Sequence, residues 1–271
     1  MALKGKVPGP DQLYLESLTA TLTGWNDPEL RLVKAFELDE FILFGQHIVP
    51  LDADGGLPAY VEILVRLKEE ERNLTPPGHF IPFLEYYGMM PLLDRWVIEH
   101  ALEWWRSNSD AQNSIMSVNL TAATLGAADF PDFVDRQLRR KEVSGKVLCF
   151  EISQAEIAAD PALLAKSVPR LKSLGCGFAV SGFGRDTVSF EALKTVPAGL
   201  IKIDGAIIRG IVIDSMALAK VKAIQQVCKK VGVRSVAESV EQPEAVKLLR
   251  QAGVDYAQGY GISRPGPLEP V

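Results

Sequence analysis

The chain has 271 residues, of which 47% are hydrophobic and 23% charged, and its 29 basic and 34 acidic side chains give a net charge of −5 at pH 7. These fractions are those of a globular protein, so they exclude a disordered, collagenous or coiled-coil chain. With no basic excess to favour a nucleic-acid partner, we expect none.

The start of the chain lacks the apolar core of a signal peptide, and no apolar run reaches membrane-spanning length. We therefore expect a cytoplasmic protein with no membrane segment. Its three cysteines, Cys149, Cys176 and Cys228, show no Cys-x-x-Cys spacing. That pattern favours reduced, buried thiols over disulfides or a zinc site.

Residues 1–26 are punctuated by glycine and proline and are only weakly periodic. We interpret them as a lead-in or linker, followed by a single domain over residues 27–271. Within that domain, short runs rich in β-branched and aromatic residues recur and predict strands. They occupy residues 41–49, 60–67, 115–120, 147–152, 177–184, 200–204, 233–239 and 256–260.

Segments with helical periodicity separate most of these runs. Residues 91–106 and 216–231 are the clearest, each with apolar side chains on one face, and in the second helix that face includes Val231. About eight strands alternating with helices predict an α/β fold of the TIM-like (α/β)8 barrel type. The first two runs are joined by a turn at residues 52–56 that is too short for a crossover helix, so one strand should be antiparallel. The rival doubly wound sheet lacks a Gly-x-Gly-x-x-Gly turn or a Walker A loop.

Polar side chains interrupt the apolar runs or directly follow them. In an (α/β)8 barrel the carboxyl ends of the strands converge on one mouth, so these side chains should meet there. Carboxylate and amide oxygens are the ligands that Mg²⁺ and Mn²⁺ prefer, and a lysine among them is suited to a phosphate or a water. The predicted mouth therefore suits an anionic, phosphorylated ligand. Its residues are Glu62, Asn119, Glu151, Lys202, Glu238 and Gln258.

At these positions the chain resembles the EAL domain family, the cyclic di-GMP phosphodiesterases and their non-catalytic relatives, over residues 36–265. The family signature Glu-Ala-Leu-x-Arg appears as Glu62-Ile63-Leu64-Val65-Arg66. Further motifs follow in family order, at residues 78–82, 95–97, 117–120, 150–153, 202–204, 237–241 and 258–260.

The resemblance implies roles for individual residues. In active relatives, the residues matching Glu62, Asn119, Glu151 and Glu238 surround two divalent metal ions, and the lysine matching Lys202 helps to position the attacking water. The residues matching Gln46, Arg66 and Gln258 contact the dinucleotide or line its groove. We expect the ligand-binding residues here to be Gln46, Glu62, Leu64, Arg66, Asn119, Glu238 and Gln258, with Glu62 and Lys202 as vestigial catalytic residues.

The chain departs from the family where active relatives have Asp-Asp-Phe-Gly. Here the aligned residues are Ser181, Gly182, Phe183 and Gly184, so both metal-binding aspartates are replaced. Asp186 is too far along the chain to substitute for either. Gln154 and Ser239 also replace the family's glutamate and glycine. Arg185 is either a surface arginine or a cation placed near the position of the lost metals.

These departures lead us to expect a degenerate domain that binds cyclic di-GMP without hydrolysing it and requires no metal. The metal positions at Glu62, Asn119, Glu151 and Glu238 would then be vestigial. One alternative is a residual phosphodiesterase, which would need Mg²⁺ or Mn²⁺. Another is a protein-interaction module that no longer binds the nucleotide. A homodimer, a protein partner and flanking GGDEF or sensor domains are also expected from the resemblance.

Overall fold

The computed structural model describes residues 14, 17, 19–52, 56–69, 73–109, 111–185 and 188–268. The described chain divides into two compact units, one within residues 1–42 and 65–93 and the other within residues 43–64 and 94–271. Most of the expected lead-in lies outside the described ranges, so its boundary at residue 26 stays a prediction. No helix in those ranges is both long and apolar enough to span a bilayer.

The first unit has a small aromatic core. Its helices are η1 (Thr19–Thr23), α2 (Pro28–Glu37) and α3 (Pro77–Tyr86), and the end of β2 (Ala59–Glu69) pairs there with β3 (Asn73–Thr75). Helix α2 begins where the carboxylate of Asp27 accepts a hydrogen bond from Leu30 N at 3.0 Å. Phe80 and Phe83 of α3 are fully buried, and the Phe80 ring lies 5.8 Å from that of Phe41.

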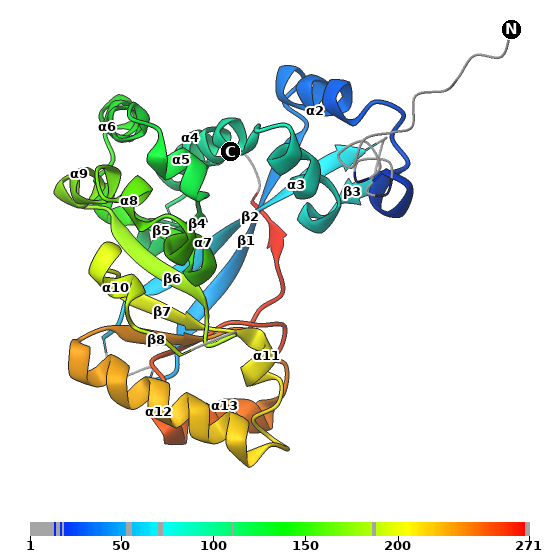
Figure 1. The fold of residues 1–271 in the computed structure, drawn as a ribbon. Helices are drawn as coiled ribbons and strands as arrows, with labels where there is room; N and C mark the ends of the chain where they lie inside the picture. The colour runs from blue at the N-terminus through cyan, green and yellow to red at the C-terminus, as the bar shows by residue number, and fades with distance from the viewer. Residues whose placement is uncertain are drawn as a thin grey trace, which may run out of the picture. The chain divides into compact units, whose positions relative to one another are not determined.

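The second unit contains a closed eight-stranded barrel (Figure 1). Its strands are β1 (Phe41–Pro50), β2, β4 (Ser114–Asn119), β5 (Leu148–Ser153), β6 (Gly177–Phe183), β7 (Leu200–Ile203), β8 (Arg234–Ala237) and β9 (Tyr256–Ala257). Each strand from β2 to β9 is parallel to the next in the barrel, whereas β1 is antiparallel to β9 and closes the barrel by pairing with β2. The predicted fold, including its one antiparallel strand, is confirmed.

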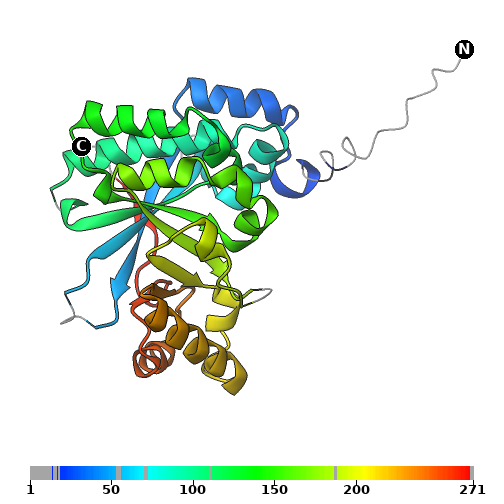
Figure 2. The same cartoon turned by 60° about the vertical axis from the view of Figure 1, so that its left-hand side comes forward.

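Helices connect the parallel strands on the outside of the barrel, and α12 and α13 lie side by side next to β8 (Figure 2). The helices are α4 (Met90–Ser107), α5 (Ala122–Gly126), α6 (Phe130–Lys141), α7 (Gln154–Ala159), α8 (Pro161–Leu164), α9 (Ser167–Ser173), α10 (Ala192–Thr195), α11 (Gly205–Ile208), α12 (Ser215–Val231) and α13 (Pro243–Ala252). Several begin at a side-chain cap directly after a strand. Thr121, Ser153 and Asp204 each accept a backbone N–H in this way, which fixes the first turn close to the barrel mouth.

The end of the barrel opposite the mouth is filled by one buried side chain from each of several strands. This cluster consists of Ile48, Cys149, Ala179, Leu200, Val236 and Tyr256. All three cysteines are buried and free, as the sequence analysis predicted. Apolar packing at this end leaves the polar side chains of the strands to gather at the other end.

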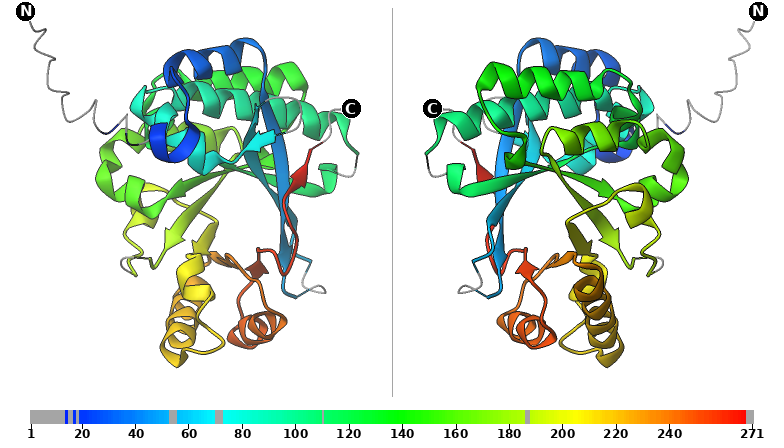
Figure 3. Two further views of the ribbon diagram at one scale, coloured as in Figure 1. Left: turned by 90° about the vertical axis from the view of Figure 1, so that its right-hand side faces the viewer. Right: turned by 90° about the vertical axis from the view of Figure 1, so that its left-hand side faces the viewer.

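Some details differ from the sequence-based expectation. Two short strands were missed, β3 and β10 (Gly266–Pro267), of which β10 runs antiparallel beside β1 (Figure 3). Strands β8 and β9 end earlier than predicted, at Ala237 and Ala257, because the chain leaves the sheet just before Glu238 and Gln258. Val231, expected on the buried face of α12, is 51% exposed because it is the last residue of that helix.

Candidate functional site

The six polar residues predicted to line the mouth all lie in the second unit, either within barrel strands or directly after them. Glu62, Asn119, Glu151 and Lys202 belong to β2, β4, β5 and β7, whereas Glu238 and Gln258 directly follow β8 and β9. Hydrogen bonds and ion pairs join all six side chains. The structure therefore brings together residues that are up to 196 positions apart in the chain.

Lys202 is at the centre of this group and is only 1% exposed. Its Nζ lies 2.9 Å from Glu62 Oε2, 2.8 Å from Glu151 Oε2 and 3.0 Å from Glu238 Oε1. Ser117 Oγ donates a further hydrogen bond to Glu151 at 3.2 Å. We refer to Lys202 and the three glutamates as the Lys202 cluster. In this cluster one ammonium faces three carboxyl groups, which leaves an excess of acidic groups.

The cluster shifts the protonation of its own members. Burial alone would lower the pKa of Lys202, but the three carboxylates outweigh burial and raise that pKa well above its ordinary value. Burial raises the pKa of Glu151 to about 7. The charges of Glu62 and Glu238 also raise this pKa, whereas the charge of Lys202 lowers it. Burial also opposes ionisation of Glu62, yet Lys202 and the amide hydrogen bonds lower its pKa. Glu62 is therefore held as a carboxylate.

Amide side chains surround Glu62 on its other sides. Asn119 Nδ2 donates to Glu62 Oε1 at 2.9 Å, and Gln258 Nε2 donates to Glu62 Oε2 at 2.5 Å and to Gln46 Oε1 at 3.0 Å. Gln46 Nε2 in turn donates to the backbone oxygen of Ser263 at 2.8 Å. Gln258 Oε1 is buried and accepts no hydrogen bond from the described residues. A buried acceptor without a partner is uncommon and costs free energy, so Gln258 Oε1 stands out among the polar atoms of the mouth.

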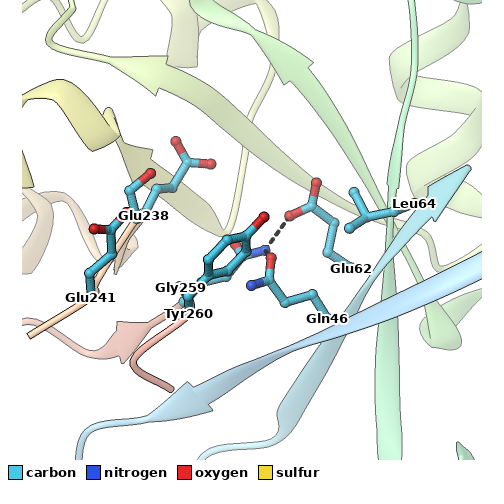
Figure 4. A pocket seen from close by; sticks show the side chains of 9 residues that line it. Gln46, Glu62, Leu64, Glu238, Glu241, Gly259 and Tyr260 are labelled. Atoms are coloured by element: carbon cyan, nitrogen blue, oxygen red, sulfur yellow. Dashed lines mark hydrogen bonds between the residues drawn. The ribbon is translucent and has the colours of Figure 1, made fainter. Parts of the chain in front are cut away.

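A cavity of about 400 Å³ opens beside the cluster (Figure 4). Its lining residues are Gln46, Glu62, Leu64, Glu238, Ser239, Glu241, Gln258, Gly259 and Tyr260. Figure 4 shows Gln46 and Glu62 projecting from neighbouring strands toward the segment that holds Glu238 and Glu241. None of the described lining residues is a lysine or an arginine. The cavity is rich in hydrogen-bond acceptors because Glu62, Glu238 and Glu241 line it.

Glu241 and Tyr260 were not among the predicted site residues. Each follows a predicted one at short range, Glu241 three residues after Glu238 and Tyr260 two residues after Gln258. Gly259 lies between Gln258 and Tyr260 in the chain. A Cβ atom added at Gly259 would come within 2.2 Å of the backbone of Val240. Only glycine lets these two loops approach so closely, and this contact places Glu241 and Tyr260 in one cavity.

Leu64, one of the predicted ligand-binding residues, lines the cavity. Arg66, another of them, belongs to the first unit. Glu62, Leu64 and Arg66 occupy alternate positions of β2. Arg66 Nη1 donates to the backbone oxygen of Val65 at 2.8 Å. Its role in ligand binding stays a prediction.

The end of β6 provides no carboxylate to the mouth. Ser181 pairs in register with Ser153 of β5, and Gly182 has a left-handed backbone with φ of +64° at an irregularity in the ladder. Arg185 Nε donates to Asp204 Oδ2 at 2.8 Å, so this arginine is paired with the chain's own carboxylate. Asp186 lies outside the described residues.

The chemistry of the donors decides whether two divalent cations fit this site. Glu62, Asn119, Glu151 and Glu238 supply oxygens, but the Lys202 ammonium lies among the carboxylates at hydrogen-bonding distance. Ser181 offers a hydroxyl, which is a weak ligand, and Gly182 has no side chain to offer. Within the described ranges, no group of three or more His, Cys, Asp or Glu side chains is arranged to hold a metal ion. Positions 181 and 182 therefore supply no carboxylate to a pair of divalent cations at the mouth.

Comparison with known proteins shows which family and which solved structures the chain resembles. The model of the EAL domain matches residues 29–265. Cyclic di-GMP phosphodiesterase PdeB of Shewanella oneidensis is 32% identical over 240 residues, which cover 88% of this chain and 28% of that protein. Cyclic di-GMP phosphodiesterase PdeF of Escherichia coli is 33% identical over 239 residues, which cover 88% of this chain and 32% of that protein. The chain thus spans about a third of the length of these relatives.

Solved structures share the fold over most of the chain. The PaMucR phosphodiesterase in complex with c-di-GMP has a TM-score of 0.80 and 28% identity, and the match covers 89% of this chain and 97% of that one. The FimX EAL domain from Pseudomonas aeruginosa bound to c-di-GMP has a TM-score of 0.82 and 25% identity, with the same two coverages.

Proposed function

The chain belongs to the EAL domain family, and on that premise we propose that it is a receptor that binds cyclic di-GMP without hydrolysing it and without a required metal. One observation supports this most strongly. The end of β6 has Ser181 and Gly182 where active relatives have aspartates, so two carboxylates of the relatives' metal site are missing from this sequence.

Lys202 supplies a positive charge that belongs to the protein itself. Attraction between an ammonium and a carboxylate grows as the local permittivity falls, so it is large at a buried site. With Lys202 in place, three carboxyl groups can be held together with no added cation. Ser181 and Gly182 carry no negative charge. A phosphate group of the ligand is therefore repelled less here than it would be beside two aspartates.

The cavity also suits the purine of the proposed ligand. Guanine presents N–H donors at N1 and N2 on one edge, and the cavity offers acceptors at Glu62, Glu238, Glu241 and Gln258. Gln258 Oε1 is the acceptor that most needs a partner, because it is buried with none among the described residues. Gln46 and Gln258 would hold the base, with Leu64 against its face, and Arg66 would bind a phosphate.

Replacing Arg66 with alanine is expected to weaken cyclic di-GMP binding at least about tenfold, because a hydrogen-bonded ion pair with phosphate is among the stronger polar contacts. The difference in affinity between wild type and Arg66→Ala should shrink as salt rises, because salt screens the attraction between Arg66 and a phosphate. Calorimetric titration at two salt concentrations measures both. Arg139→Ala is the control, since Arg139 is an exposed residue that pairs with Asp135 within α6 and its removal should leave affinity unchanged. Equal affinities for wild type and Arg66→Ala would contradict a phosphate role for Arg66.

The retained residues Glu62, Asn119, Glu151 and Glu238 favour one alternative, a residual phosphodiesterase that uses Mg²⁺ or Mn²⁺. Turnover by purified protein that disappears in Glu62→Ala would establish it. A protein-interaction module without nucleotide binding is the second alternative, and absence of any cyclic di-GMP binding would favour it. A homodimer, a protein partner, flanking GGDEF or sensor domains and a cytoplasmic location are further proposals from the family resemblance.

A further inference from the structure

Asp94 is a buried carboxylate outside the Lys202 cluster, and no prediction from the sequence assigned it a role. It lies in α4 and is 5% exposed. Its Oδ2 accepts hydrogen bonds from Thr121 N at 3.1 Å, Thr121 Oγ1 at 2.9 Å and Thr124 Oγ1 at 2.5 Å. Hydrogen bonds to a charged acceptor are stronger than neutral ones. Asp94 therefore anchors the residue that lies two positions after Asn119.

The loop anchored by Asp94 is also bonded to the end of the next strand. Ala122 N donates to Glu156 Oε1 at 3.1 Å, and Glu156 Oε2 accepts from Ser153 Oγ at 2.7 Å. Leu120 N donates to the backbone oxygen of Glu151 at 2.8 Å. The ends of β4 and β5 are thus joined by hydrogen bonds that use neither Lys202 nor the cavity.

We propose that Asp94 is a positioning residue for the Lys202 cluster, which holds the loop after β4 so that the Asn119 amide stays directed at Glu62. Asn119 is the last residue of β4, and beyond it the backbone bond from Leu120 N to the oxygen of Glu151 is followed by the bonds from Thr121 to Asp94. Its Nδ2 is 2.9 Å from Glu62 Oε1, and Glu62 lines the cavity. Loss of the Asp94 anchor would let the amide move and leave one oxygen of Glu62 without its donor.

Asp255, a partly buried carboxylate at the opposite end of the barrel that also pairs with Arg234 at 2.8 Å, provides a control. Asp255 Oδ2 accepts hydrogen bonds from Ser235 N at 2.9 Å, Ser235 Oγ at 3.1 Å and Gln225 Nε2 at 3.3 Å. Asp255 directly precedes β9, whereas Gln258, which lies at the mouth, directly follows that strand. Removing Asp255 breaks bonds of the same kind without touching the mouth.

The experiment compares Asp94→Ala with Asp255→Ala at pH 8. Burial raises the pKa of Asp94 to about 6, with the Glu156 charge acting in the same direction, so Asp94 is ionised at that pH. Asp94→Ala should increase amide hydrogen exchange at residues 119–122 and weaken cyclic di-GMP affinity about tenfold. Asp255→Ala should increase exchange near residue 235 and leave affinity within about twofold, because the two sites are independent. Asp94→Asn keeps an acceptor oxygen and should recover part of the affinity.

Two results would overturn the proposal: unchanged exchange at residues 119–122 in Asp94→Ala, or equal losses of affinity in the two alanine variants. The affinity comparison rests on the proposed function, but the exchange comparison does not. If the wild type bound no cyclic di-GMP, the receptor function would fail, and the exchange at residues 119–122 would still decide the role of Asp94. Should an alanine variant not fold, Asp94→Asn and Asp255→Asn are compared by the same two measurements.

Discussion

Replacing Lys202 with methionine is expected to lower the free energy of unfolding by about 3–5 kcal/mol at pH 8, the range seen when one partner of a buried ion pair is removed. Methionine matches the length of the lysine stem but has no charge. The carboxylates of Glu62, Glu151 and Glu238 would then repel one another without a cation among them. Urea denaturation of wild type and variant measures the difference.

The size of this loss should depend on pH in a defined direction. In the wild type, the pKa of Lys202 is higher in the folded state than in the unfolded state. The stabilisation that Lys202 provides is therefore complete below the ordinary lysine pKa, and it is lost only as pH rises through the folded-state pKa. In the variant, protonating the glutamates relieves their repulsion, and the pKa of Glu151 is already about 7 in the wild type. The difference between the two proteins should therefore be largest at pH 8 and fall to about half at pH 5.

Lys141→Met is the matched control for this prediction. Lys141 is nearly as buried as Lys202 but pairs with the single carboxylate of Glu103, which is 45% exposed. Its loss should cost less than about 1 kcal/mol, as for an ion pair close to solvent. Equal destabilisation by Lys202→Met and Lys141→Met would show that the Lys202 cluster has no special role in stability.

Installing aspartates at positions 181 and 182 together is expected to make the protein respond to Mn²⁺. Gly182 has a left-handed backbone, in which aspartate is tolerated at a cost of about 1–2 kcal/mol. A Cβ at Gly182 would meet no atom within 4 Å, so the new side chain has room. Mn²⁺ should then raise the melting temperature, and cyclic di-GMP should be converted to the linear dinucleotide at least about a hundredfold faster than by the wild type.

The control for this double variant is Ser181→Asn with Gly182→Asn, which has nearly the same shape and no added charge. It should show neither the Mn²⁺-dependent rise in melting temperature nor turnover. An aspartate variant that is as insensitive to Mn²⁺ as the asparagine variant would mean that these two positions do not explain the missing metal site.

The fold could be predicted from the sequence because a barrel of parallel strands leaves a strong pattern. Buried strands such as β5 and β7 are mainly apolar, apart from site residues such as Glu151 and Lys202, and lie between amphipathic helices, so both their number and their order are visible. Strands β3 and β10 were missed because each is only two or three residues long and lacks a periodic pattern of its own. The 51% exposure of Val231 was missed because helical periodicity does not show whether another element covers the last turn of a helix.

The candidate site was predictable only in part. Polar residues at strand ends identify Glu62, Asn119 and Lys202, because charge is rare in a buried strand without a purpose. The central position of Lys202, in contact with three glutamates, depends on the relative register of β2, β5, β7 and β8, which no single strand encodes. Glu241 and Asp94 were missed because one lies in a loop and the other in a helix, where an acidic residue is ordinary.

The most direct test of the account is a calorimetric titration of cyclic di-GMP into the purified wild-type protein, once in EDTA and once in Mn²⁺, followed by analysis of the recovered nucleotide. We expect the same dissociation constant in both buffers and intact cyclic di-GMP at the end of each titration. Binding that disappears in EDTA, or linear dinucleotide formed in Mn²⁺, would contradict the proposal of a metal-independent, non-catalytic receptor.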